Sequence, residues 1–245
     1  MKQIRSLRAL GALTLALSLI LALQVTAAQR IRISSMPQVV DPSFVFEQPL
    51  PASDPVDMNW FADAAFVGGS QTGKLMSYSP LEAGLWLTRD DLDVVSALTA
   101  TFPVNGKELP LVDALRQSGC AKVYLMIGVP GDVGSTEEGF VQAYGNLISH
   151  IREALPDIQI YLQTLLPFTA SWGETYGFDN AVVRWRNERL LQTARSSKVY
   201  LVDVASAFFS PSGSLPEHLS TDGLFLTPEG HYIWVEYLRT HTMRT

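Results

Sequence analysis

A serine in a short turn is the residue of this 245-residue chain best placed to do chemistry. Ser70 follows the apolar run at residues 64–67 and two glycines, and it precedes a segment with helical character. The glycines permit a tight turn, so the sequence predicts a strand, a turn and a helix, with the serine hydroxyl at the carboxyl edge of a sheet. Such a serine could act as a nucleophile, with backbone N–H groups of the helix start holding an oxyanion. The alternative is a serine that caps the helix.

A second turn, at residues 221–230, contains Asp222 and leads into a predicted helix with Thr227 as its N-cap. A serine nucleophile needs a base within hydrogen-bonding reach and an acid that orients the base. Three residues after Asp222 stands Phe225, whose ring accepts no proton. His218, four residues before Asp222, is the best substitute for the missing base. We expect His231 to be structural, and the other histidines, His150 and His241, to lie on the surface.

Together the two segments resemble the first and last sequence blocks of the SGNH (GDSL-type) hydrolases. The resemblance runs from about residue 61 to residue 241. In that family the first-block serine is the nucleophile, and Asp-x-x-His in the last block supplies the base and its orienting acid. The resemblance therefore implies that Ser70 is the nucleophile and Asp222 the orienting acid, while Phe225 replaces the histidine. It also implies a flavodoxin-like, three-layer α/β/α fold.

The family's oxyanion hole is also altered. In the family it uses a glycine after the second strand and an asparagine after the third, in a Gly-x-Asn segment that here reads Gly128-Val129-Pro130. Pro130 offers no N–H group to an oxyanion, and one lost donor typically lowers the rate by ~10²–10³. Asp91 lies near the glycine position, where it would place a carboxylate against the developing charge; the alternative is a solvated loop. We expect Gly69, Gly128 and Thr72 to line the cleft.

Strand-like and helix-like segments alternate from Trp60 onward, which predicts a parallel sheet of about five strands covered by helices. We predict strands at residues 64–67, 92–97, 121–128, 158–165 and 199–204, and helices at residues 110–118, 137–155, 181–195 and 228–240. A loop at residues 170–180 contains Trp172, Tyr176 and Phe178. These aromatic rings would either stack on a sugar or pack onto the domain.

The N-terminal residues have the pattern of an export segment. Lys2, Arg5 and Arg8 precede an apolar run at residues 9–23, and small residues follow it. Fifteen helical residues span roughly 22 Å, less than a bilayer core of about 30 Å. Residues 1–28 are therefore predicted to be a signal peptide rather than an anchor, residues 29–58 an extended arm, and residues 59–245 the hydrolase-like domain. The location would be extracytoplasmic, secreted or at the cell surface.

Composition excludes several functions. The net charge is −6, and removing residues 1–27 with their three positive charges would give −6 − 3 = −9. No basic patch follows the N-terminus, so nucleic acid is not an expected partner, and a neutral glycan is tolerated better than an anionic polymer. The single cysteine excludes an intramolecular disulfide. Asp132 and Asp203 lack nearby histidines, so no metal and no cofactor are expected.

Three functional hypotheses follow. The first is an exported, catalytically impaired SGNH-fold protein that binds a glycan, an envelope component or a protein partner. The second is an active serine esterase of the carbohydrate O-deacetylase type, with His218 as its base. The third is a structural module without a cleft. A membrane is a partner only through an uncleaved N-terminal segment.

Overall fold

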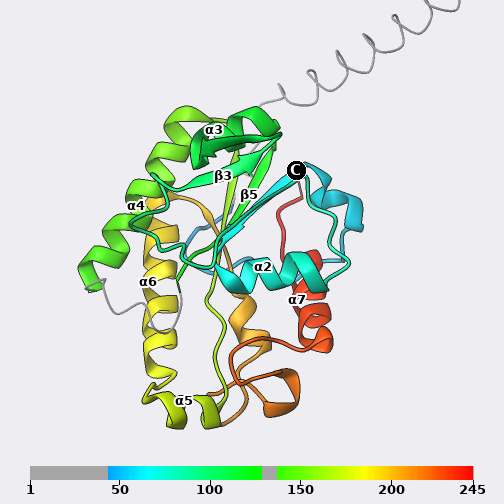
Figure 1. Ribbon diagram of the computed structural model, residues 1–245, viewed down its shortest axis with the longest axis vertical. Helices are drawn as coiled ribbons and strands as arrows, with labels where there is room; N and C mark the ends of the chain where they lie inside the picture. The colour runs from blue at the N-terminus through cyan, green and yellow to red at the C-terminus, as the bar shows by residue number, and fades with distance from the viewer. Residues whose placement is uncertain (1–43, 129–136, 245) are drawn as a thin grey trace, which may run out of the picture. The chain divides into compact units, whose positions relative to one another are not determined.

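The structure is a computed structural model that describes residues 44–128 and 137–244. Its centre is a five-stranded parallel sheet in the order β2–β1–β5–β6–β7 (Figure 1). The strands are β1 (Ala64–Gly68), β2 (Leu85–Thr88), β5 (Lys122–Met126), β6 (Gln159–Gln163) and β7 (Tyr200–Val202). Because the strand order reverses between β1 and β5, their carboxyl ends form the place where such sheets bind ligands.

Helices cover both faces of this sheet. α2 (Ser70–Tyr78) and α7 (Pro228–Thr240) contact each other, whereas α3 (Leu111–Ser118), α4 (Glu137–Ala154) and α6 (Ala181–Ser197) form a second contacting group. Figure 1 shows the two groups on opposite sides of the strands, which confirms the expected three-layer α/β/α fold. The short helix α5 (Ala170–Tyr176) lies beyond the carboxyl ends of the strands.

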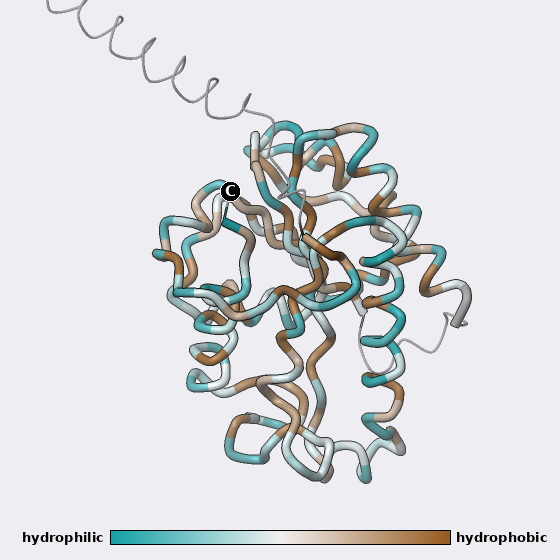
Figure 2. The backbone as a smooth tube through the Cα atoms, turned by 180° about the vertical axis from the view of Figure 1, so that it is seen from behind, coloured by the Kyte–Doolittle hydropathy of each residue, from teal (hydrophilic) through white to brown (hydrophobic). Residues whose placement is uncertain are grey.

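The sheet is central because β1, β5, β6 and β7 are buried along their whole length. Strands that are apolar on both faces need a covering layer on each side, and the helices provide it with one hydrophobic stripe each. Hydrophobic and hydrophilic residues accordingly alternate along the helices in Figure 2. Stacked rings cross the sheet in register from Trp86 through Phe66 and Tyr124 to Tyr161.

One predicted strand is wrong. Residues 92–97 form turns, and the second strand of the sheet is β2, a few residues earlier. The Asp93 side chain accepts hydrogen bonds from the backbone N–H groups of Val95 and Ser96, at 2.7 and 2.8 Å. A carboxylate that binds its own backbone in this way favours a turn over a strand.

Three further elements, the strands of a hairpin and a short helix, were not predicted from the sequence. β3 (Thr101–Val104) and β4 (Lys107–Pro110) form an antiparallel hairpin whose turn residues, Asn105 and Gly106, both have positive φ. Asn-Gly between apolar segments is a strong hairpin signal and could have been recognised. The third is α5, in the segment expected to be a loop. Its N-cap, Thr169, accepts a hydrogen bond from the N–H of Trp172.

The described part of the predicted arm, from residue 44 to Asp57, contains no helix or strand and lies against the domain. Leu50 donates its N–H to the carbonyl of Leu201 in the edge strand β7, at 2.8 Å. Val56 donates its N–H to the carbonyl of Arg239 in α7, at 2.9 Å. The 3₁₀ helices η1 (Met58–Asp63), η2 (Val204–Ala207) and η3 (Glu217–Leu219) complete the described elements.

The predicted export segment, residues 1–28, and the first part of the arm lie outside the described residues. Within residues 44–128 and 137–244, no helix combines the length and the apolar character needed to cross a membrane.

Candidate functional site

Ser70 lies where the sequence predicts it, on the turn between β1 and α2. It is the first residue of α2, and the N-cap position is occupied by Gly69, so the serine does not cap its own helix. The side chain is half-buried and makes no hydrogen bond within the described part of the chain. Its hydroxyl is therefore available to a ligand at the carboxyl end of β1.

The turn depends on Gly68. A Cβ atom at this position would lie 2.0 Å from the Oγ1 of Thr72 and 2.4 Å from the carbonyl oxygen of Met126. No side chain fits there, so the glycine allows α2 to start close to the end of β5. This close approach positions Ser70 at the junction of the two strands.

Two of the three residues expected to line the cleft are buried. Thr72 is fully buried, with its Oγ1 directed toward Gly68, so it does not line the surface as predicted. Gly69 is buried as well. Gly128 is half-buried at the end of β5, with a φ of 130° that favours glycine. Pro130, two residues after Gly128, lies outside the described residues. The loss of an oxyanion donor at this position therefore stays a prediction.

Asp222 binds its own turn rather than a histidine. Its Oδ1 accepts hydrogen bonds from the N–H groups of Leu224, at 3.0 Å, and Phe225, at 2.8 Å. The turn is closed by a hydrogen bond from the N–H of Thr221 to the carbonyl of Phe225, at 2.9 Å. The side chain of Asp222 is thus a structural acceptor in an exposed turn.

This turn docks on α2, next to Ser70. Gln71 donates its side-chain amide to the carbonyl of Leu224, at 2.7 Å. One helical turn after Ser70, the ammonium group of Lys74 lies 5.3 Å from the centre of the Phe225 ring and 5.6 Å from that of Tyr78. Sequence reasoning identified Phe225 but missed Lys74, although residues four apart on a helix share a face.

No histidine forms a catalytic pair with Ser70 or Asp222. His218 is exposed on η3 and makes no hydrogen bond to either residue. His231 is buried, and its Nδ1 lies 2.9 Å from the carbonyl oxygen of Thr227 in the preceding turn of the chain. His241 stacks on a tyrosine of α7, and His150 is exposed on α4.

The pKa of His231 is lowered, chiefly by burial and further by the positive charge of Lys74, against the opposing effect of the Thr227 hydrogen bond. The imidazole is therefore neutral, and its Nε2 is buried without a hydrogen-bond partner. His231 and Lys74 are electrostatic neighbours, which places the histidine beneath the candidate site rather than in it.

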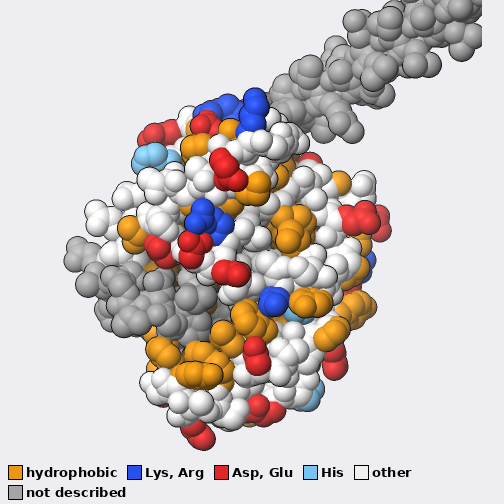
Figure 3. Space-filling view, viewed as in Figure 1, with side chains coloured by type: hydrophobic (Ala, Val, Ile, Leu, Met, Phe, Trp, Pro, Cys, Tyr) orange, Lys and Arg blue, Asp and Glu red, His pale blue; other side chains and the backbone are white. Residues whose placement is uncertain are grey.

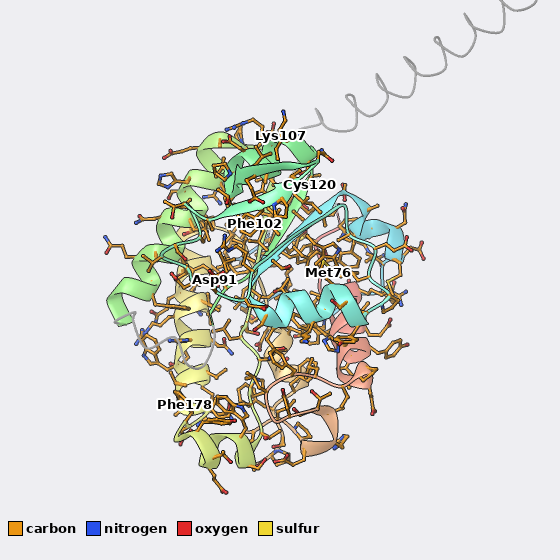
Figure 4. The ribbon with its side chains drawn as sticks, viewed as in Figure 1. Met76, Asp91, Phe102, Lys107, Cys120 and Phe178 are labelled. Carbon is orange, nitrogen blue, oxygen red and sulfur yellow. The ribbon has the colours of Figure 1, made fainter. Side chains whose placement is uncertain are left out.

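Asp91 follows β2 in the loop where the resemblance places it, but its carboxylate is not free. Arg89 holds both oxygens, with Nε 2.9 Å from Oδ1 and the second guanidinium nitrogen 2.8 Å from Oδ2. The hydrogen bond to Arg89 lowers the pKa of Asp91, which is exposed. Figure 4 shows Asp91 beside the start of α2. The pair adds no net charge to the site.

The aromatic residues of the 170–180 segment pack mainly on one another. The ring of Trp172 lies 4.8–5.6 Å from those of Phe168, Tyr176 and Phe178. A Cβ atom on Gly223 would lie 2.6 Å from the Cβ of Trp172, so α5 lies directly against the Asp222 turn. Tyr176 is 61% exposed, which leaves part of this cluster available to a ligand.

A separate cavity of about 330 Å³ lies between the arm, α6 and the ends of β6 and β7. Asp203 lines it, accepts a hydrogen bond from Thr164 at 3.0 Å, and has a pKa raised by burial. Its predicted position at a strand end is confirmed. The part of the chain that the structure describes contains no group of three side chains able to hold a metal, and Asp132 lies outside it.

Comparisons with known proteins agree with this architecture. Residues 89–233 match the sequence model of the GDSL-like lipase/acylhydrolase family. The matched segment contains Asp222 and Phe225, whereas Ser70 precedes it. Among curated proteins there is no significant match.

Solved structures with the same fold include three enzymes or candidate enzymes. A GDSL-like lipase from Bacteroides thetaiotaomicron has a TM-score of 0.59 at 15% identity, over 76% of this chain and 89% of its own. A candidate acylhydrolase from Bacteroides fragilis also reaches 0.59, at 17% identity, over 71% and 83%. An acetyl xylan esterase reaches 0.51 at 14% identity, over 71% and 96%. At these identities the likeness supports the fold alone.

Proposed function

Because the chain belongs to the GDSL-like lipase/acylhydrolase family, we propose that it is an exported member that has lost efficient catalysis. The surface around Ser70, at the carboxyl ends of β1 and β5, then serves to bind a ligand. A glycan, a component of the cell envelope and a protein partner are the ligand classes that suit an exported domain of this kind.

The observation that carries this proposal is the environment of Phe225. The family's base would stand at this position, and here a phenyl ring lies over α2 beside the ammonium of Lys74. Neither Ser70 nor Asp222 has a histidine partner within the described residues. Removing the base of a comparable triad lowers turnover by about 10⁶.

The alternative is an active esterase of the carbohydrate O-deacetylase type. One structural neighbour is an acetyl xylan esterase, and Ser70, on the turn where the family has its nucleophile, makes no hydrogen bond through its hydroxyl to any described residue. Because residue 225 is a phenylalanine, this alternative needs a base from another position. If His218 is that base, it has to approach both Ser70 and Asp222. His218 is exposed on η3, in the segment that leads into the Asp222 turn.

An ester-hydrolysis assay separates the two. We expect the purified protein to hydrolyse p-nitrophenyl acetate and acetylated xylan no faster than its Ser70→Ala variant, because the nucleophile lacks a base. Ser77→Ala, on the same helix with an exposed side chain, is the matched control. Turnover that depends on Ser70 would establish the esterase instead.

The positive control for the assay is the double variant Phe225→His with Pro130→Asn. It restores the base position and one oxyanion donor, and each normally changes the rate by ~10² or more. Ser70-dependent turnover in this variant shows that the assay detects the chemistry when the two groups are present.

A further inference from the structure

We propose that the surface around Ser70 and Lys74 binds a saccharide that carries a carboxylate, and that Lys74 recognises its negative charge. The inference rests on the proposed function, because it names the ligand class of the same surface. It uses only residues of α2, α5 and the Asp222 turn.

The ammonium of Lys74 has no carboxylate partner in the described part of the chain. Its contacts are the rings of Phe225 and Tyr78, which attract a cation without neutralising it. His231, the nearby titratable group, is neutral because burial and Lys74 itself lower its pKa. An uncompensated positive charge therefore lies over the ring that replaces the family's base.

Two acids of the site, Asp222 and Asp91, are already engaged. Asp222 accepts two backbone hydrogen bonds in its own turn, and both carboxylate oxygens of Asp91 accept hydrogen bonds from the Arg89 guanidinium. Neither acid makes an ion pair with Lys74. An external anion can therefore bind this lysine without displacing any partner in the described residues.

Ser70 supplies the second donor. It lies four residues before Lys74, on the same face of α2, and its hydroxyl has no partner among the described residues. Without a base, this hydroxyl can donate a hydrogen bond but is a poor nucleophile. One neutral and one charged donor suit a carboxylate, which accepts charge-assisted hydrogen bonds on two oxygens.

The aromatic residues of α5 supply a surface for the sugar rings. Trp172 lies against Gly223, and Phe225, two residues further along the same turn, lies against Lys74. Two residues span at most ~7 Å, so the aromatic cluster and the charge are within reach of one short oligosaccharide. Figure 3 shows hydrophobic side chains gathered on this face between the regions of α2 and α5, with a basic side chain among them.

The net charge of −6 does not oppose such a ligand at close range. At physiological ionic strength, charges farther away than about 8 Å are largely screened, so the contact with Lys74 dominates. The negative surface does disfavour long anionic polymers, and the expected ligand is accordingly a short or terminal acidic sugar.

The test compares two trisaccharides by calorimetry and by ¹⁵N NMR with the full chain. The probes are α-1,4-trigalacturonate and α-1,4-galactotriose, which have the same linkage and ring configuration and contain no ester. We expect trigalacturonate to bind about tenfold or more tightly, the range of one charge-assisted hydrogen bond. Lys74→Met abolishes this preference, Lys74→Arg keeps it, and Tyr176→Ala weakens binding of both sugars.

Lys107→Met, on the distant β3–β4 hairpin labelled in Figure 4, is the matched control for loss of one lysine. Equal affinity for both sugars, no detectable binding of trigalacturonate at millimolar concentration, or an unchanged preference in Lys74→Met overturns the proposal. These readouts are independent of ester turnover. Failure here is therefore distinct from failure of the proposed function, which Ser70-dependent hydrolysis would show.

Discussion

His231 combines a buried ring with a free Nε2, and its protonation is coupled to Lys74. Because its pKa is lowered in the folded protein, the unfolded chain binds a proton more readily below the ordinary histidine pKa of about 6.5. The contribution of neutral His231 to stability is therefore fully present above that pH. It is lost progressively as the pH falls.

NMR titration tests this coupling. We expect the pKa of His231 to lie below the ordinary histidine value, and to rise in Lys74→Met because a lowering charge is removed. A His231 pKa at or above 6.5, or one that does not respond to the substitution, contradicts the arrangement.

Among individual residues, those whose chemical role follows from residue type alone could be identified as candidates from the sequence. Ser70 and Phe225 could be identified because a serine after two glycines and a phenylalanine at a base position have clear chemical meaning. Lys74 and the Arg89–Asp91 pair could not, because their roles depend on which side chains of other elements lie nearby. Thr72 was misplaced because helix periodicity does not say how closely α2 approaches β5.

Between elements, the contact of β1 with the start of α2 is the tightest in the candidate site. Gly68→Ala places a methyl group against Thr72 and the backbone of Met126. We expect a loss of about 3 kcal/mol in unfolding free energy, because backbone atoms cannot move aside as a flexible side chain can.

Gly145→Ala, in the middle of α4, is the matched control. Nothing lies within 4 Å of a Cβ atom there, so the substitution should stabilise the protein by about 1 kcal/mol through helix propensity. Urea unfolding measures both variants. Equal effects of the two substitutions would show that the β1–α2 junction is not tightly packed.

Long periodic helices and fully buried strands were predictable because their pattern repeats over many residues. α4, α6 and α7 begin at the residues expected. β2 was missed because it is a four-residue edge strand that is only partly buried, so its composition carries little signal. The turn at Asp93 was read as a strand because its apolar residues outweighed the carboxylate that organises it.

For the whole domain, the arm matters more than its irregular sequence indicates. It covers the edge of β7, and Arg195 donates two hydrogen bonds to the carbonyl of Glu47, at 3.0 and 2.6 Å. Phe44 and Phe46 pack on Tyr200. Covering an edge strand satisfies its free backbone groups and prevents pairing with another chain.

We expect Leu50→Ala to lower the unfolding free energy by about 2–4 kcal/mol, because this side chain is only 4% exposed and its loss leaves a cavity. Val45→Ala, 61% exposed in the same arm, should change it by less than about 0.5 kcal/mol. Urea unfolding of both variants checks this. An arm that served only as a linker would give the same small effect for both.

The contacts of the arm also set the order in which the fold can be completed. Arg239 donates to the carbonyl of Val56 from 183 residues further along the chain, and the N–H of Val56 bonds to α7 in return. Val56 is among the first residues of the domain to be synthesised, yet its partner in α7 is among the last. Incomplete chains that end before α7 therefore lack the partner of Val56, and this end of the arm stays exposed to chaperones and proteases until the C-terminus has emerged.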